Sequence, residues 1–185
     1  MFWQLARMTS PEQSALRLER WRRASLPTVR FSIGMPATLQ GLGLLDCELL
    51  VRDSQLVGQH SPFQAGDNPM YLSRHLTLSY LWVLGAYEIV RSMAQQMRAN
   101  SDMDIAKGST LSMLLQTFER LRIPLAKFEA SNRRANTDFP IVYPALDPVH
   151  GISWEVSIDV YISRTSLSNQ LLDYLCGPNK PSEGA

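Results

Sequence analysis

The side chains that could do chemistry in this chain are few and widely spaced. The histidines are His60, His75 and His150, and the cysteines are Cys47 and Cys176. A zinc site needs several such ligands at short, regular spacing, and these five residues show no spacing of that kind. A phosphate-binding glycine loop and a G-x-S-x-G nucleophile motif are also absent from the sequence. We therefore predict no catalytic residue, no metal and no cofactor, and the sequence favours, without deciding, a protein that is not an enzyme.

Glu88 is the carboxylate whose position most invites a functional interpretation. It stands between Tyr87 and Ile89 in an apolar segment, where a buried charge without a partner is costly. Arg91 follows three residues later and shares its helix face, so we interpret Glu88 and Arg91 as a structural ion pair. Other cations that could meet Glu88 come from a later segment: Arg120, Arg122 and Lys127. The alternative is a small-molecule enzyme or sensor with a buried Glu88 whose pKa is raised.

The segment 132–151 contains the residues that we predict to form a contact surface. It has three prolines within nine residues: Pro140, Pro144 and Pro148. This pattern predicts an extended loop rather than a regular element. Long loops often carry function because a rigid scaffold presents them. We predict that Arg133, Arg134, Tyr143 and His150 bind a partner, although a plain connection between helices is the competing interpretation.

A second group of cations, Arg20, Arg22 and Arg23, lies in a predicted N-terminal helix. Such arginines can bind RNA phosphates, so an RNA-binding or RNA-processing protein is an alternative. The whole chain has 18 basic and 17 acidic residues, for a formal net charge of +1. This balance argues against a surface dedicated to nucleic acid. A solvated, charged helix face is the simpler interpretation of the three arginines.

The segment 68–98 is the element that must organise the fold. Apolar residues recur along it at spacings of three and four and also occupy its other faces, which predicts a buried helix. Asn68 can cap this helix and Pro69 suits its first position. The apolar stretch is interrupted by polar residues and falls short of the roughly 20 residues that a bilayer requires, so we predict no membrane partner.

A second amphipathic stripe predicts another long helix over about 110–131, with Pro124 inside it. Together with the helix at about 69–98, it is expected to form a long antiparallel helical hairpin. Ser10 and Pro11 predict an N-terminal helix over 11–24, and Gly177 and Pro178 end a short C-terminal helix over about 165–175.

A small antiparallel sheet completes the expected fold, with strands at about 28–34, 44–51 and 152–162. In each of these segments apolar and polar residues alternate, which is the period of a half-buried strand. The second strand would present Asp46 and Glu48 on its outer face. The third is either one long strand or a hairpin that turns near 157–159, and we expect it to pair with the second.

The fold class that follows is α+β and mainly helical, in a single domain over 1–178 with a disordered tail at 179–185. A chain of 185 residues with 45% hydrophobic residues suits one domain with a substantial core. The two cysteines are too few for a disulfide framework, and the first ten residues lack the apolar run of a secretion signal, so we expect a cytoplasmic location.

These patterns together favour a non-enzymatic intracellular protein that binds or regulates another protein, as antitoxins, immunity proteins and adaptors do. RNA binding through the N-terminal helix and an enzyme or sensor built on Glu88 are the two alternatives. A homodimer is a further possibility, because methionines near one end of the predicted hairpin could form an apolar surface: Met93, Met97 and Met113. Packing of these methionines in the core is the competing interpretation.

Overall fold

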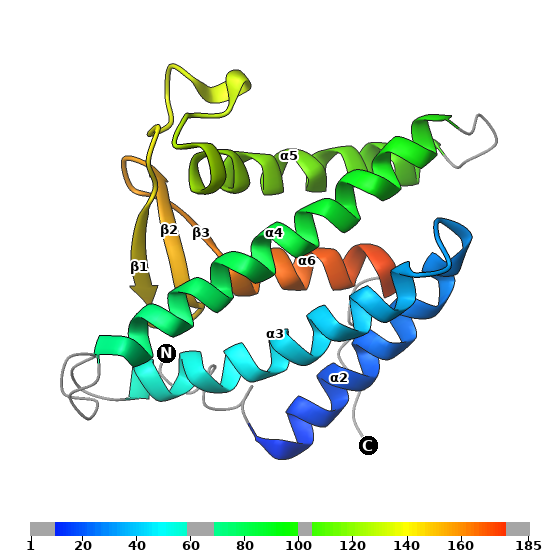
Figure 1. The fold of residues 1–185 in the computed structure, drawn as a ribbon, viewed down its shortest axis with the longest axis horizontal. Helices are drawn as coiled ribbons and strands as arrows, with labels where there is room; N and C mark the ends of the chain where they lie inside the picture. Colours follow the sequence, from blue (N-terminus) through cyan, green and yellow to red (C-terminus); the bar gives the residue numbers. More distant parts are fainter. Residues whose placement is uncertain (1–9, 59–68, 100–104, 177–185) are drawn as a thin grey trace.

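The computed structural model describes residues 10–58, 69–99 and 105–176, and it has the α+β, mainly helical architecture that the sequence predicts (Figure 1). Five helices hold most of these residues: α2 (Pro11–Ser25), α3 (Met35–Gly58), α4 (Pro69–Ala99), α5 (Ile105–Lys127) and α6 (Arg164–Cys176). Two short 3-10 helices lie between them: η1 (Leu26–Arg30) and η2 (Asn132–Arg134). The strands are β1 (Tyr143–Asp147), β2 (Gly151–Ser157) and β3 (Val160–Ser163).

The predicted helical hairpin is confirmed by α4 and α5, which run in opposite directions along one another (Figure 1). Trp82 of α4 and Phe118 of α5 are both fully buried, with ring centroids 6.4 Å apart. The second helix begins at 105 and ends at 127, earlier at both ends than predicted. Within the part of the chain that the structure describes, no helix is long and apolar enough to cross a membrane.

Two of the three predicted strands are wrong, because residues 28–34 and 44–51 are helical or lie in a turn. The first segment covers the end of η1 and the turn before α3, and the second lies inside α3. The buried residues of α3 recur at helical spacing: Met35, Leu39, Gly43, Asp46, Leu49, Leu50, Asp53 and Leu56. Asp46 is fully buried while Glu48 is exposed, so the expected outer pair of acids is also wrong. The alternation of apolar and polar residues over 44–51 did not indicate a strand, because Asp46, a polar residue expected on the solvent side, is buried.

The third predicted strand is confirmed in its hairpin form, with β2 and β3 joined by a turn at Ile158 and Asp159. Its partner, however, is β1 and not the segment 44–51, and the sheet order is β1-β2-β3. The predicted loop 132–151 therefore contains a strand. Pro144 is compatible with that strand because β1 lies at an edge, where a missing backbone N–H donor is tolerated.

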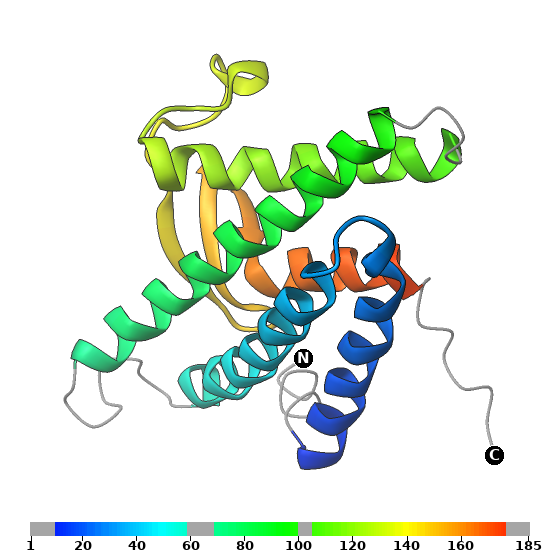
Figure 2. The same cartoon turned by 45° about the vertical axis from the view of Figure 1, so that its right-hand side comes forward.

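The helices α3 and α6 pack against the α4–α5 hairpin, and α2 packs against α3 and α6. Ser10 caps α2 by accepting a hydrogen bond from Gln13 N at 3.2 Å, as predicted. Ser163 caps α6 in the same way, with Ser166 N at 3.0 Å. The helix α6 lies between the α4–α5 hairpin and the α2–α3 pair (Figure 2). The predicted cap at 68 and the predicted tail at 179–185 lie outside the described residues.

Candidate functional site

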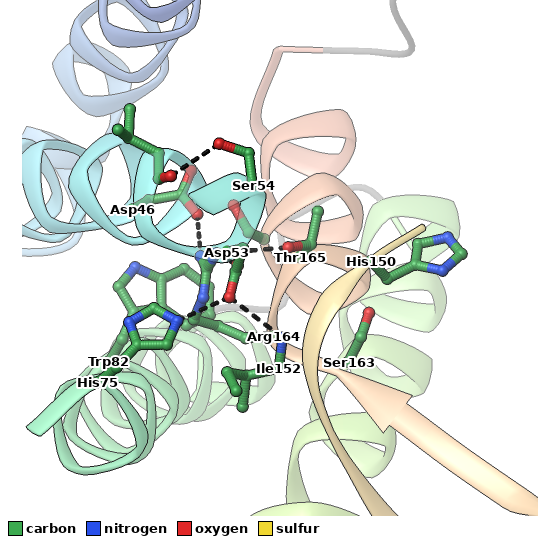
Figure 3. Close-up of polar contacts among 12 residues, drawn as sticks. Asp46, Asp53, Ser54, His75, Trp82, His150, Ile152, Ser163, Arg164 and Thr165 are labelled. Atoms are coloured by element: carbon green, nitrogen blue, oxygen red, sulfur yellow. Dashed lines mark hydrogen bonds and ion pairs between the residues drawn. The ribbon is translucent and has the colours of Figure 1, made fainter. Parts of the chain in front are cut away.

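A network of buried charges lies where α3, α4 and α6 meet. Asp46 and Asp53 stand seven residues apart on one face of α3, His75 comes from α4, and Arg164 is the first residue of α6. Arg164 lies between the two carboxylates: its Nη1 donates to Asp46 Oδ1 at 2.5 Å and its Nη2 donates to Asp53 Oδ2 at 2.7 Å (Figure 3). Its guanidinium also lies 5.9 Å from the centroid of the Trp82 ring.

The second oxygen of Asp53 connects the network to α4 and to the sheet. Its Oδ1 lies 2.7 Å from His75 Nε2 and accepts a hydrogen bond from Ile152 N at 3.1 Å. Gly151 makes this approach possible, because a Cβ at that position would lie 2.2 Å from Asp53 Cγ. Gly151 also has a φ of +70°, which other residues adopt only with strain. The start of β2 is thus held against α3.

The second oxygen of Asp46 connects the network to α2 and the middle of α6. It accepts hydrogen bonds from Arg17 Nε at 2.6 Å and from Trp21 Nε1 at 2.9 Å. Arg17 extends the chain of contacts to Asn169 Oδ1 at 2.9 Å and Ser168 Oγ at 2.6 Å. We call Arg17, Asp46, Asp53, His75 and Arg164 the buried charge network.

The charge state of Asp46 follows from these partners. Burial raises the pKa of its carboxyl group, but the positive charges of Arg17 and Arg164 and the hydrogen bonds from Arg17 and Trp21 outweigh burial. The net result is a pKa below the ordinary value of 3.8. Asp46 is therefore ionised at neutral pH, as an ion pair with two arginines requires.

The network has the components of a general base, yet it is closed to substrate. A histidine held by a carboxylate is a common catalytic pair. Here Asp46, Asp53, His75 and Arg164 all have an exposed fraction of 0%. Three further polar atoms in this region are buried and have no hydrogen-bond partner: His75 Nδ1, Ser79 Oγ and Arg164 Nε. A substrate has no path to these atoms in this conformation, so we interpret the network as the link between four helices and the sheet.

Metal and thiol chemistry find no support among the residues that the structure describes. No group of three or more His, Cys, Asp or Glu side chains there could hold a metal ion. Burial, together with the neighbouring Asp46 carboxylate, raises the pKa of the Cys47 thiol to about 11. Burial also raises the pKa of Cys176. Both cysteines are thus poor nucleophiles at neutral pH, because the reactive form of a cysteine is the thiolate.

The arginines that the sequence singles out in the N-terminal helix form ion pairs with neighbouring carboxylates. Arg20 Nη2 lies 2.6 Å from Asp173 Oδ1, and both Arg22 and Arg23 donate to Glu19 at distances of 2.7–2.8 Å. The hydrogen bonds from Arg22 and Arg23 lower the pKa of Glu19 to about 2. Arg20 therefore has a carboxylate of its own, whereas Arg22 and Arg23 share that of Glu19.

Glu88 lies on the surface, so the expectation of a buried Glu88 is wrong. Its side chain is 49% exposed, and Arg91 Nη2 lies 2.7 Å from Glu88 Oε2. The other cations that could have met it have different partners. Arg120 pairs with Asp138, Arg122 lies over the Tyr87 ring, and Lys127 lies 3.4 Å from Glu129. A sensor or enzyme built on an enclosed Glu88 loses its premise.

The four predicted contact residues are not brought together. Tyr143 begins β1 and makes an edge-to-face contact with Phe139, with ring centroids 6.0 Å apart. His150 lies beyond the other end of β1, where its Nδ1 is 3.2 Å from Asp147 Oδ1. Figure 3 shows His150 directed away from the buried charge network. Arg133 and Arg134 lie elsewhere, in η2.

Arg133 and Arg134 line a pocket of about 360 Å³ between α5, η2 and β3. The wall from α5 consists of Met113, Gln116, Thr117, Glu119 and Arg120. The wall from the sheet consists of Val160, Tyr161 and Ile162, and Ser131 lies at the end of the pocket with the two arginines. We call this the arginine pocket. Its volume is in the range of pockets that bind small ligands or short peptide segments.

The buried charge network could not be read from the chain, because its members are far apart in sequence and each is unremarkable alone. The one local signal was the spacing of seven between Asp46 and Asp53, which places both on one helix face. Comparison of the chain with known protein families, with curated proteins and with solved structures gave no match.

Proposed function

We propose that this protein is a non-enzymatic binding protein, and that the arginine pocket receives an acidic segment of another protein. The observation that carries the proposal is the state of Arg133 and Arg134. Both side chains are exposed and line the pocket, and neither forms an ion pair with any residue in the described ranges. Surface arginines without a carboxylate are suited to an incoming one, since the guanidinium group can bind a carboxylate through two hydrogen bonds.

The charges around the pocket support an anionic partner. Arg120 is already neutralised by Asp138, through hydrogen bonds of 2.7 and 2.8 Å. Glu119 is the remaining carboxylate of the wall, so one negative charge is present beside the two positive charges of Arg133 and Arg134. Positive charge therefore exceeds negative charge at this site, and a partner with carboxylates would be attracted to it.

The apolar side chains around the pocket support a protein partner. Met113 is 62% exposed and Tyr161 is 51% exposed, and Val160 lies beside them. Methionine, tyrosine and arginine are enriched where proteins bind one another. A partner segment that carries both carboxylates and apolar side chains matches this wall.

Binding to a displayed library of random peptides tests the proposal. Selection on the wild-type protein is expected to enrich peptides with Asp or Glu beside an apolar residue. The affinity of a selected peptide, measured by fluorescence anisotropy, should fall more than about tenfold in the Arg133→Glu/Arg134→Glu variant, because the charge that attracts the peptide is reversed. It should also fall as salt is added, because ions screen this attraction.

The matched control is the Arg74→Glu/Arg98→Glu variant. It makes the same change of charge at two exposed arginines of α4 that lie outside the arginine pocket. Its affinity for the selected peptides should stay close to the wild-type value. Equal binding by wild type and Arg133→Glu/Arg134→Glu, or a selection that enriches no acidic peptide, would remove the proposal.

RNA binding is the weaker candidate because Arg20, Arg22 and Arg23 are paired with carboxylates. A fluorescence anisotropy titration with single-stranded RNA at low salt is expected to be flat. Steep, salt-dependent binding that is lost in the Arg20→Ala/Arg22→Ala/Arg23→Ala variant would reverse this ranking.

A further inference from the structure

The sheet wall of the arginine pocket is formed by the edge of a strand. Three consecutive residues of β3 line the pocket: Val160, Tyr161 and Ile162. Successive side chains of a strand point to opposite faces of the sheet, so a hollow that touches three in a row follows the edge of the strand and not one face.

This edge is open. The sheet order is β1-β2-β3, so β3 has a strand neighbour on one side only. Among the described residues, no backbone–backbone hydrogen bond joins Val160, Tyr161 or Ile162 to a segment other than β2. An open edge offers a row of backbone donors and acceptors to another chain.

The opposite wall is one face of a helix. Four of the five α5 residues that line the pocket lie at steps of three, one and three along the helix, which is the spacing of a single helical face: Met113, Gln116, Thr117 and Arg120. Glu119 lies at the side of this face. The pocket is thus a groove between a strand edge and a helix, and Arg133 and Arg134 stand at one end of it.

That end lies beside the start of β3. Phe139 N donates to Val156 O at 2.8 Å, and Ser157 Oγ donates to Thr137 O at 2.7 Å. These bonds fasten the segment after η2 to the last residues of β2. Figure 1 shows residues 128–142, in yellow, at the end of the sheet where β2 turns into β3.

We propose that the partner segment binds as an added β-strand along the free edge of β3, with a carboxylate beside Arg133 and Arg134. This inference rests on the proposed function and states how the acidic segment is held. Backbone hydrogen bonds to β3 supply affinity for any extended sequence, and alternate side chains, which face α5, supply selectivity. The partner strand matches the four residues of β3, a span of about 13 Å at the rise of a β-strand.

A second copy of this chain fits the groove less well. A symmetric antiparallel pairing of two β3 strands would bring residues 160–163 of the other copy into the groove, and these four residues carry no carboxylate. Its Asp159 would then lie beside the Ser163 end, away from Arg133 and Arg134. The arginines would remain unpaired in such a dimer.

Backbone methylation of a selected acidic peptide tests strand addition. Peptides from the library selection are made with a single N-methyl group at each position in turn. We expect affinity to fall more than about tenfold at every second position within the bound segment and to change little at the positions between. The reason is that an added strand directs alternate N–H groups at its neighbour. Hydrogen exchange should show slower exchange in residues 160–163 when peptide is bound.

A bulky side chain in the groove gives an independent measurement. Gln116→Trp places an indole on the α5 wall and should lower peptide affinity more than about tenfold, whereas Gln95→Trp makes the same exchange at an exposed position of α4 and should not. Both variants should keep the wild-type melting temperature, because both positions are exposed.

The outcomes separate the two proposals. Peptide binding that depends on Arg133 and Arg134, without alternation in the methylation series and without slower exchange in β3, overturns strand addition and leaves the proposed function standing. Peptide binding that ignores the arginines overturns both. A concentration-dependent dimer mass in light scattering that is lost in Gln116→Trp would assign the groove to a second copy and would likewise overturn the proposal.

Discussion

The buried charge network and the arginine pocket use the same residue types in opposite ways. In the network, Arg164 is fully buried and each of its two terminal nitrogens meets a carboxylate. In the pocket, Arg133 and Arg134 are exposed, and the described part of the chain provides them with no ion pair. A buried charge without a partner is strongly destabilising, while an exposed one costs little. Paired charges thus hold the fold, and we propose that the unpaired ones bind a partner molecule.

The largest effect that this comparison predicts is the loss of Arg164. In Arg164→Met, Asp46 and Asp53 keep their burial but lose the cation between them, so the free energy of unfolding should fall by about 3–5 kcal/mol. Arg134→Met should change it by less than about 0.5 kcal/mol, because that side chain is exposed and unpaired. Urea denaturation measures both values. Similar losses in the two variants would contradict the distinction between network and pocket.

The next effect concerns the glycine that lets the sheet reach the network. Gly151→Ala should lower the free energy of unfolding by about 2 kcal/mol or more, since its Cβ would overlap Asp53 and its φ is positive. Gly41→Ala is the control, because that helical position has no atom within 4 Å of an added Cβ. The control should stabilise the protein by about 0.5–1 kcal/mol in the same urea experiment. An unchanged Gly151→Ala protein would show that β2 does not depend on this contact.

Acid should weaken the buried charge network through Asp46. The pKa of Asp46 is lower in the folded chain than its ordinary value of 3.8, so the folded state binds the proton less readily than the unfolded state does. The stability due to Asp46 is complete above this ordinary value and is lost as the pH falls through the folded pKa. The slope from one such group reaches at most about 1.4 kcal/mol per pH unit.

Stability measured between about pH 5 and pH 2 should therefore fall more steeply in the wild type than in Asp46→Asn, which has no proton to gain at this site. Parallel curves for wild type and Asp46→Asn would mean that Asp46 is not held in its charged form by the two arginines.

The smallest effect is expected at the residue that follows α5. Phe128 follows α5 with a φ of +58° and donates its N–H to Pro124 O at 3.3 Å. Glycine usually occupies this left-handed position after the end of a helix. Phe128→Gly should raise the melting temperature, by an amount equivalent to about 1 kcal/mol, because it removes backbone strain at a side chain that is 69% exposed. A lower melting temperature would show that the exposed ring stabilises the fold through contacts of its own.

The long helices were predictable because their signals are local. The apolar spacing in α4 and α5 and the caps of α2 and α6 depend on residues within a few positions of one another. The β-structure over 152–162 was predictable for the same reason, although the alternation left open whether it forms one long strand or a hairpin. The strand expected at 44–51 failed because the burial of Asp46 depends on Arg17 and Arg164, which lie 29 and 118 residues away.

The candidate site was likewise predictable only in part. Arg133 and Arg134 could be named from the sequence, because consecutive arginines in a proline-rich segment stand out. Tyr143 and His150 were grouped with them only by proximity in the chain, and the β1–β2 pairing places those two residues at opposite ends of a strand. The groove itself was not predictable, because it exists only where α5 faces the edge of β3.

By itself, the amino-acid sequence determined which segments bury apolar surface as helices, since apolar residues recur in them every three or four positions. The tertiary structure alone decided which charges are satisfied. Arg17 and Arg164 meet carboxylates of α3, whereas Arg133 and Arg134 meet none within the described ranges. Charge pairing acts between side chains brought together by folding, and no local pattern records which cation will reach which carboxylate.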